Sequence, residues 1–263
     1  QGFIRPISAT LPLQIMHKKI VGIFDDFSKA DCNGEKSCEL QTYDKDKVSR
    51  GLRMQANLDR FEPLYISQFL GTHNSAISRR YTHSQGDFNL NLADPNQFLS
   101  IPRLLDRGVR QIELDIVWDN KLKQIKICHN HFSDKLNWLL CDNNFELPYA
   151  LAQIRSWIDG FKQKNPNEPL LLIIYMDINQ ALPQDVISIL DNDFGVLSPY
   201  IYLKNETKAN MLDTQSLSKH SLSSQNKHII ITADSDEDIS SINASNIVFT
   251  KIENANKTPL VHL

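Results

Sequence analysis

The sequence lacks the features of several protein classes. No apolar run is long enough to cross a membrane as a helix; the longest, at 170–176, has seven residues and is followed by Asp177. The 28 Lys and Arg residues nearly balance the 31 Asp and Glu residues, giving a net charge of -3. This balance gives no electrostatic case for nucleic acid, and no such partner is expected. The chain starts at Gln1 without the basic and apolar regions of a signal peptide, so we expect a trimmed or processed chain.

Cysteine is also sparse. The four cysteines form two close pairs, Cys32 with Cys38 and Cys128 with Cys141. Neither pair has CxxC spacing, which argues against zinc binding and thioredoxin-like chemistry. Two interpretations remain, namely two local disulfides or buried free thiols. Disulfides would suit a secreted or periplasmic protein, and that is the location we expect.

Short apolar strands alternate with amphipathic helices along most of the chain. Strands are expected at 65–70, 109–117, 124–129, 170–177, 200–203, 228–232 and 247–251, and the clearest helices at 147–161 and 183–194. This alternation predicts an α/β fold with mainly parallel strands, a TIM-type (β/α) barrel. About seven strands are expected where a closed barrel has eight, so the barrel is predicted to be distorted or incomplete. A doubly wound sheet is the alternative, but the sequence has no G-x-G-x-x-G segment.

The first 60 residues show no clear pattern. We interpret 1–60 as an N-terminal extension packed on the barrel and 61–263 as the catalytic barrel itself. The connection between the strands at 109–117 and 124–129 is short enough for either a hairpin or a tight crossover.

Two carboxylates share one face of the strand at 109–117. Because side chains alternate along a strand, Glu113 and Asp115 point one way while Ile112, Leu114 and Ile116 point the other. Neighbouring ionised carboxylates repel, and they need a cation or a shared proton. A solvated strand face is the alternative, but this strand is otherwise apolar. We therefore predict that the apolar face packs on helices and that the acidic face lines the barrel mouth as a metal-assisted acid/base site.

Other polar candidates lie at strand ends. His73 follows the first expected strand, His129 ends the strand after the acidic pair, and Asp177 ends the buried strand at 170–177. Active sites of barrels form at the C-terminal ends of the strands. We therefore expect these three side chains to cluster with Asp115.

Five segments in this order resemble one enzyme family. They are GTHNS at 71–75, GVRQIELDI at 108–116, ICH at 127–129, the amphipathic helix expected at 147–161, and LLLIIYMD at 170–177. A PNQ segment, with SI following within 95–101, also precedes GVRQIELDI. Together they resemble the catalytic X region of phosphatidylinositol-specific phospholipases C, and the spacing is closest to the calcium-dependent bacterial-type members. The resemblance covers about residues 64–180.

The resemblance assigns roles residue by residue. It implies two catalytic histidines, His73 and His129, and four calcium ligands, Asn74, Glu113, Asp115 and Asp177. The last ligand is usually Glu in the family, and Asp177 is shorter. The family usually has Gly after the second histidine; here Asn130 follows, and His131 is a rival for that role.

The implied function is calcium-dependent cleavage of phosphatidylinositol to diacylglycerol and a cyclic or free inositol phosphate. Carboxylate and amide oxygens are hard ligands that suit Ca²⁺, the implied cofactor. Peripheral contact with a membrane and a monomeric state are expected. The apolar residues at 132–140 either form a rim that inserts into the bilayer or a buried loop. Two alternatives remain: a related barrel phosphodiesterase acting on glycerophosphodiesters or sphingomyelin, and an inactive lipid- or inositol-binding module.

Overall fold

A mainly parallel sheet organises the part of the chain that the structure describes. The computed structural model describes residues 47–78, 97, 99–128, 146–178, 182–207, 210–233 and 237–251. The strands are β1 (Gly71–Thr72), β2 (Gln111–Asp119), β3 (Gln124–Ile127), β4 (Leu172–Ile178), β5 (Ile229–Ala233) and β6 (Val248–Phe249). They form one sheet in the order β1-β2-β4-β5-β6, and β3 pairs with β2. The pairs along this order are parallel and β2–β3 is antiparallel, so the short connection is a hairpin.

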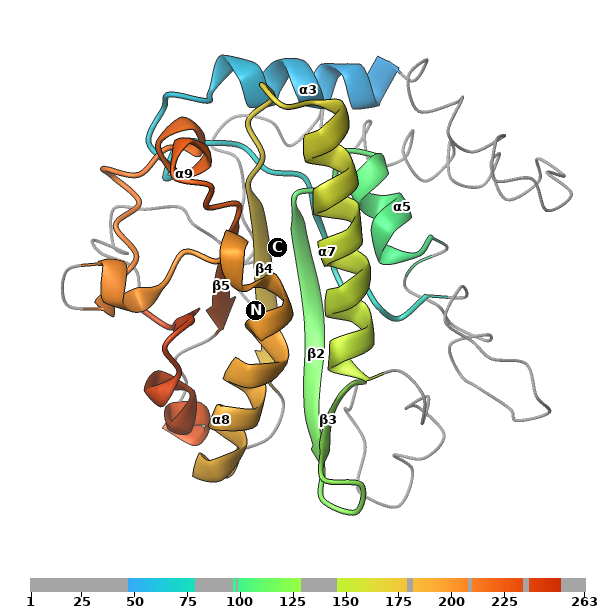
Figure 1. Ribbon diagram of the computed structural model, residues 1–263, viewed down its shortest axis with the longest axis vertical. Coiled ribbons are helices and arrows are strands. Elements are labelled where there is room, and N and C mark those ends of the chain that lie inside the picture. Colours follow the sequence, from blue (N-terminus) through green and yellow to red (C-terminus); the bar gives the residue numbers. More distant parts are fainter. Residues whose placement is uncertain are drawn as a thin grey trace, which may run out of the picture.

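Helices cover one face of the sheet and one of its ends. They are α3 (Lys47–Leu58), α5 (Ile101–Asp106), α7 (Leu147–Lys164), α8 (Gln184–Asp193) and α9 (Lys219–Ser224), with 3-10 helices η2 (Phe194–Tyr200), η3 (Lys204–Glu206) and η5 (Glu237–Ala244). Figure 1 shows α7 running along β2 and α3 crossing one end of the sheet, while the β2–β3 hairpin lies at the other end. None of the described helices combines the length and the apolar character needed to cross a membrane.

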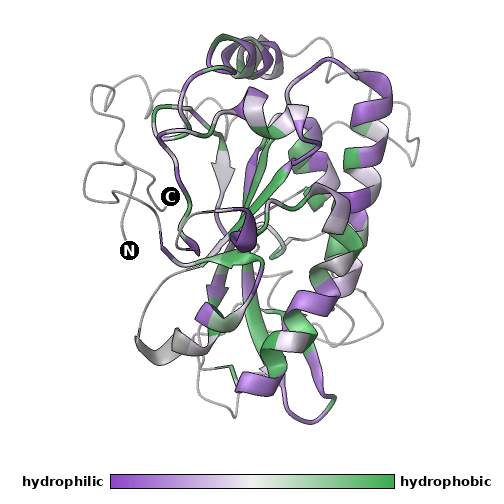
Figure 2. Ribbon diagram, turned by 60° about the vertical axis from the view of Figure 1, so that its left-hand side comes forward, coloured by the Kyte–Doolittle hydropathy of each residue, from purple (hydrophilic) through white to green (hydrophobic). Residues whose placement is uncertain are grey.

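The core confirms the predicted faces of β2. Ile112, Leu114 and Ile116 are each fully buried and pack in one cluster with Leu151 and Ile154 of α7. In Figure 2 the strands are largely hydrophobic, whereas the helices carry hydrophobic and hydrophilic residues in turn. Burying one such side chain contributes about 1.5–3 kcal/mol. The period of the apolar residues therefore sets which face of β2 the helix covers.

Two local predictions differ from the structure. The expected strand at 65–70 is turn and irregular chain, and β1 contains only Gly71 and Thr72. The expected strand at 200–203 is reduced to one bridge, between Ile201 and Ile229. These weak segments have few β-branched residues of their own, so their state depends on pairing partners far away in the chain.

Helix α3 lies in the segment that the sequence left without a pattern. It packs near the end of α5, where Gly108 has φ +92°; a Cβ there would lie 2.9 Å from Leu52 Cδ1. Glycine is therefore required at this turn for both its backbone conformation and the close approach. Residues 1–46 lie outside the described residues, so the boundary between an extension at 1–60 and a barrel at 61–263 stays a prediction.

A buried histidine near the start of β5 makes stability depend on pH. His228 is 4 % exposed; its Nδ1 lies 3.0 Å from the Leu170 carbonyl oxygen and its Nε2 lies 2.8 Å from Lys162 Nζ. A carbonyl only accepts, so Nδ1 carries the proton and Nε2 accepts from the ammonium group. Burial and Lys162 together lower the pKa of His228, against the raising effect of the bond to Leu170. Charging this imidazole would place two cations side by side.

We therefore expect stability to fall as pH drops. The unfolded chain takes up this proton near pH 6.5 and the folded chain only at lower pH, so stability present above about pH 6.5 is lost below it, with a slope of at most about 1.4 kcal/mol per pH unit. Urea unfolding between pH 7.5 and pH 5 measures the slope. His228→Asn keeps a donor toward Leu170 but no titrating group, and its slope should be shallower than that of the wild type. Equal slopes would contradict the assignment.

Candidate active site

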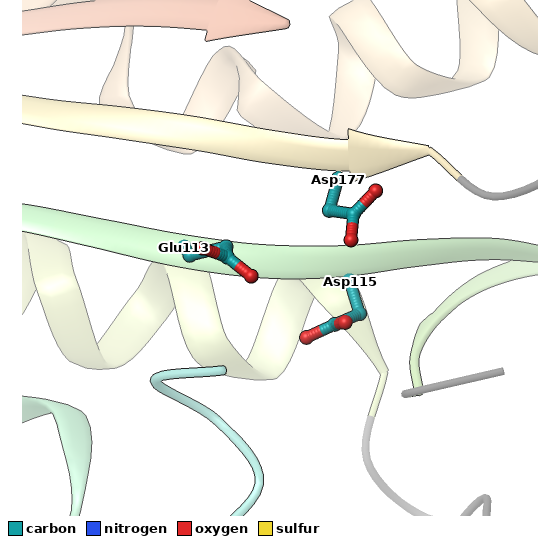
Figure 3. Close-up of side chains that lie close together, drawn as sticks. All are labelled: Glu113, Asp115 and Asp177. Atoms are coloured by element: carbon teal, nitrogen blue, oxygen red, sulfur yellow. The ribbon is translucent and has the colours of Figure 1, made fainter. Parts of the chain in front are cut away.

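Three carboxylates converge on one face of the parallel ladder between β2 and β4, which pairs Gln111–Ile116 with Ile173–Ile178. Glu113 and Asp115 come from β2 and Asp177 from β4, and one oxygen of each lies within 4.8 Å of one oxygen of the others (Figure 3). Two residues apart on one strand, Glu113 and Asp115 share a face; the β2–β4 register then sets Asp177 beside Asp115. Glu113 is 7 % exposed and Asp115 is fully buried. The structure thus brings together three of the residues that the sequence predicts as metal ligands; their role stays a prediction.

One edge of β2 is not paired with another strand at the level of Glu113 and Asp115. Residues of β1 pair with β2 only as far as Thr72 opposite Ile112, and β3 joins β2 only from Ile127 opposite Ile116. Between these points Ser75 N donates to the Glu113 carbonyl oxygen, and Cys128 N donates to the Asp115 carbonyl oxygen. The backbone of β2 at the acidic pair is therefore held by one residue from the segment after β1 and one from the segment after β3.

The loop after β1 carries His73. Its Nε2 lies 3.4 Å from Glu113 Oε1, and its side chain is 59 % exposed, so the imidazole faces the solvent side of the carboxylates. The Gln97 side chain holds this loop from the opposite side, with Nε2 donating to the His73 carbonyl oxygen over 2.7 Å. Asn74 follows, is buried, and has φ +46°, a left-handed conformation that Asn tolerates better than most residues. Its role as a ligand stays a prediction.

Cys128 is the last described residue after β3. This cysteine is disulfide-bonded, so the disulfide interpretation holds for it, and the free-thiol alternative does not. Its partner lies outside the described residues, as do Cys32, Cys38 and Cys141. Also outside them are His129, Asn130 and His131, and the apolar stretch 132–140, so the second catalytic histidine stays a prediction. The Cys128 amide on the Asp115 carbonyl does place the residue before His129 beside the acidic pair.

An apolar cluster lies on the same face of the sheet, toward the N-terminal ends of the strands. Leu171, Ile230 and Phe249 share the face of Asp177, and they are buried together with residues from the connecting segments. The inner face therefore changes from apolar to acidic along the strands, as expected for a barrel with its site at one mouth.

Sequence reasoning missed Ser75 and Gln97 as members of the site. Both stand within segments that the sequence singled out, GTHNS and PNQ. Their contacts, however, join residues 38 and 24 positions apart in the chain. No local pattern reports partners at such separations.

Comparison with known proteins gives matches at the levels of family and fold. A family model described as the Rv2075c PI-PLC-like domain matches residues 36–239. The uncharacterized proteins MT2135 and Rv2075c, from two strains of Mycobacterium tuberculosis, are 31% identical over 150 residues. That match covers 55% of this chain and 29% of theirs, so the chain spans less than a third of these relatives.

Solved structures extend the comparison. A phosphatidylinositol-specific phospholipase C from Listeria monocytogenes matches with a TM-score of 0.50 at 17% identity, over 78% of this chain and 65% of that one. A calcium-dependent phosphoinositol-specific phospholipase C from Pseudomonas sp., in its apo form, matches with a TM-score of 0.43 at 15% identity, over 66% and 58%. The Listeria structure shows the fold. Together with the family model it confirms the predicted α/β barrel class and the predicted family resemblance, with a sheet that is not closed over the described residues.

Proposed function

This chain belongs to the Rv2075c PI-PLC-like domain family, and on that premise we propose that it is a calcium-dependent phosphodiesterase that cleaves phosphatidylinositol. The products are diacylglycerol and a cyclic or free inositol phosphate. The observation that carries the proposal is the convergence of Glu113, Asp115 and Asp177 beside His73 on one face of the β2–β4 ladder. A metal-binding acidic group next to an exposed imidazole is the minimum equipment for acid/base cleavage of a phosphodiester.

The donor set fits calcium. Three carboxylates offer only hard oxygen atoms, and Ca²⁺ takes six to eight oxygen ligands in flexible geometry. The buried Asn74 stands in the adjoining loop as a proposed fourth donor. The three carboxylates include neither the thiolate nor the imidazole that is typical of zinc sites. A bound Ca²⁺ would neutralise charge developing on the phosphodiester and lower the pKa of a coordinated inositol hydroxyl.

In this proposal the two histidines carry out the proton transfers. His73 takes the proton from the inositol 2-hydroxyl, and Glu113, whose Oε1 lies 3.4 Å from His73 Nε2, stabilises the imidazolium that forms. The 2-oxygen forms a bond to the neighbouring phosphorus, and the bond from phosphorus to the glycerol oxygen breaks. His129 donates a proton to that leaving oxygen. Because the attacking 2-hydroxyl and the phosphorus belong to one molecule, the first step is helped by proximity and gives a cyclic inositol phosphate.

The decisive experiment is hydrolysis of phosphatidylinositol vesicles with Ca²⁺ and with EDTA, with products followed by phosphorus NMR. The proposal expects a cyclic inositol phosphate only when Ca²⁺ is present. Release of a glycerophosphate or a ceramide phosphate from the corresponding lipids would favour the related phosphodiesterase. Binding to the vesicles without cleavage would favour the inactive module.

The state of Cys128 bears on the cellular compartment in which the protein works. A disulfide at Cys128 is supported by the structure, and disulfides persist in oxidising compartments. We therefore propose that the protein works as a secreted or periplasmic enzyme. The monomeric state stays an expectation.

We further propose that the β2–β3 hairpin touches the lipid surface. Its turn, Asn120–Lys121–Leu122–Lys123, is exposed, and Figure 1 shows the hairpin at the end of the sheet opposite α3. Leu122 is 50% exposed between two lysines. Asp119 Oδ1 accepts from the amides of Lys121 and Leu122, which makes the turn rigid. A leucine flanked by cations suits an interface of acyl chains and anionic headgroups.

Replacing Leu122 by Ser should weaken binding to phosphatidylinositol vesicles by about 5–10-fold, because insertion of the leucine into the acyl region is lost. Co-sedimentation with vesicles measures the change. Val196→Ser is the matched control, since Val196 is 40% exposed but lies on η2. The proposal is wrong if both variants bind as tightly as the wild type.

A further inference from the structure

One buried serine joins the His73 loop to the acidic strand. Ser75 is fully buried, and its Oγ accepts from the Glu113 backbone amide at 2.9 Å. The same Oγ lies 2.9 Å from the Thr72 carbonyl oxygen and 2.7 Å from Thr72 Oγ1. Its own amide donates to the Glu113 carbonyl oxygen at 3.1 Å. One hydroxyl has one donor and two lone pairs, so both the strand contact and the loop contact are made at once.

These contacts limit the interruption of the parallel pairing with β2 to a two-residue loop, which we call the excursion. Thr72 pairs with Ile112 in the ladder, and Ser75 resumes contact with β2 at the next residue, Glu113. The excursion therefore contains only His73 and Asn74. Its outer side is fastened by the Gln97 side chain on the His73 carbonyl oxygen. The loop can present an imidazole to Glu113 because its two ends are held one strand residue apart.

We propose that Ser75 is a positioning residue that holds Glu113 and the His73–Asn74 excursion in the geometry the site requires. This inference rests on the proposed function. Alanine at 75 would leave the buried Glu113 amide without its acceptor, and the strand or the loop would shift to find another. Metal ligands and acid/base groups are sensitive to sub-ångström placement, and loss of a supporting hydrogen bond typically lowers metal affinity or activity by about 10–100-fold.

Ser78 offers a matched control three residues further along. It is also fully buried, and its Oγ donates to the Leu99 carbonyl oxygen at 2.7 Å. Ser75→Ala and Ser78→Ala each remove one buried hydroxyl from the same segment, but only the first touches Glu113. Both should lower the melting temperature.

The test compares the two variants with the wild type. Calcium affinity is measured by isothermal titration calorimetry. Turnover is measured on phosphatidylinositol vesicles, and hydrogen exchange of the Glu113 amide is measured by NMR. Ser75→Ala should weaken Ca²⁺ binding and lower kcat by about tenfold or more each and speed the Glu113 amide exchange. Ser78→Ala should stay within about twofold of the wild type in all three. Should Ser75→Ala fail to fold, Ser75→Cys keeps the volume and offers only a weak acceptor.

Two outcomes overturn the inference. One is a Ser75 variant that keeps Ca²⁺ affinity and turnover; the other is an equal loss in both serine variants, which would mean a general packing effect. A wild-type protein that neither binds Ca²⁺ nor cleaves phosphatidylinositol would instead refute the proposed function. The two failures are therefore distinguishable.

Discussion

Replacing Asp115 by Asn is expected to abolish calcium binding and to lower turnover of phosphatidylinositol by about a thousandfold. Asp115 is fully buried at the centre of β2, with Asp177 as its partner in the register of β4. Asparagine keeps the shape of the side chain but removes the charge that would attract a divalent cation. Titration of Ca²⁺ followed by calorimetry, and turnover on vesicles, measure the two effects.

The effect of Asp115→Asn on the melting temperature should have opposite signs without Ca²⁺ and with Ca²⁺. Without Ca²⁺, three carboxylate oxygens within 4.8 Å of one another repel, so removal of one charge should raise the melting temperature of the metal-free protein. With Ca²⁺, the wild type should gain stability by binding and the variant should not. Asp185→Asn removes a negative charge from the exposed first turn of α8 and serves as the control. A calcium-induced rise in melting temperature that survives in Asp115→Asn would refute the assignment of this ligand.

Replacing Lys219 by Met should destabilise the protein by about 3–5 kcal/mol, because it leaves a buried carboxylate without its cation. Lys219 Nζ lies 2.6 Å from Asp59 Oδ1, and the two side chains are 4% and 7% exposed. The ammonium group also donates to the Gln68 carbonyl oxygen and lies over the Phe69 ring, 4.5 Å from its centroid. The pair thus fastens the chain just after α3 to α9. Equilibrium unfolding in urea at pH 7 measures the loss.

Two further variants define the origin of that effect. Asp59→Leu combined with Lys219→Met removes both charges and should be less destabilised than Lys219→Met alone. Arg103→Met, which breaks a half-exposed pair with Asp106 at 3.6 Å, should cost about 1 kcal/mol or less. Equal losses for Lys219→Met and Arg103→Met would show that burial does not set the strength of the Asp59–Lys219 pair.

Local periodicity was enough to predict much of the fold. The alternation in β2 assigned Ile112 and Leu114 to the core and Glu113 and Asp115 to the opposite face, because a strand can only alternate. The apolar spacing in α7 likewise predicted one buried stripe. Helix α3 was missed because its sequence, KVSRGLRMQANL, spaces few apolar residues among many polar ones, and two of them, Met54 and Leu58, are exposed.

What the sequence by itself determined is the chemistry available: which side chains stand at strand ends, and which face of each strand they take. Tertiary structure alone decided which of them meet. The β2–β4 register sets Asp177 beside Asp115 across 62 positions (177 minus 115), and Ser75 reaches Glu113 across 38. The physical reason is that residue preferences act over a few neighbours, whereas strand register and buried hydrogen bonds are settled by the whole core at once.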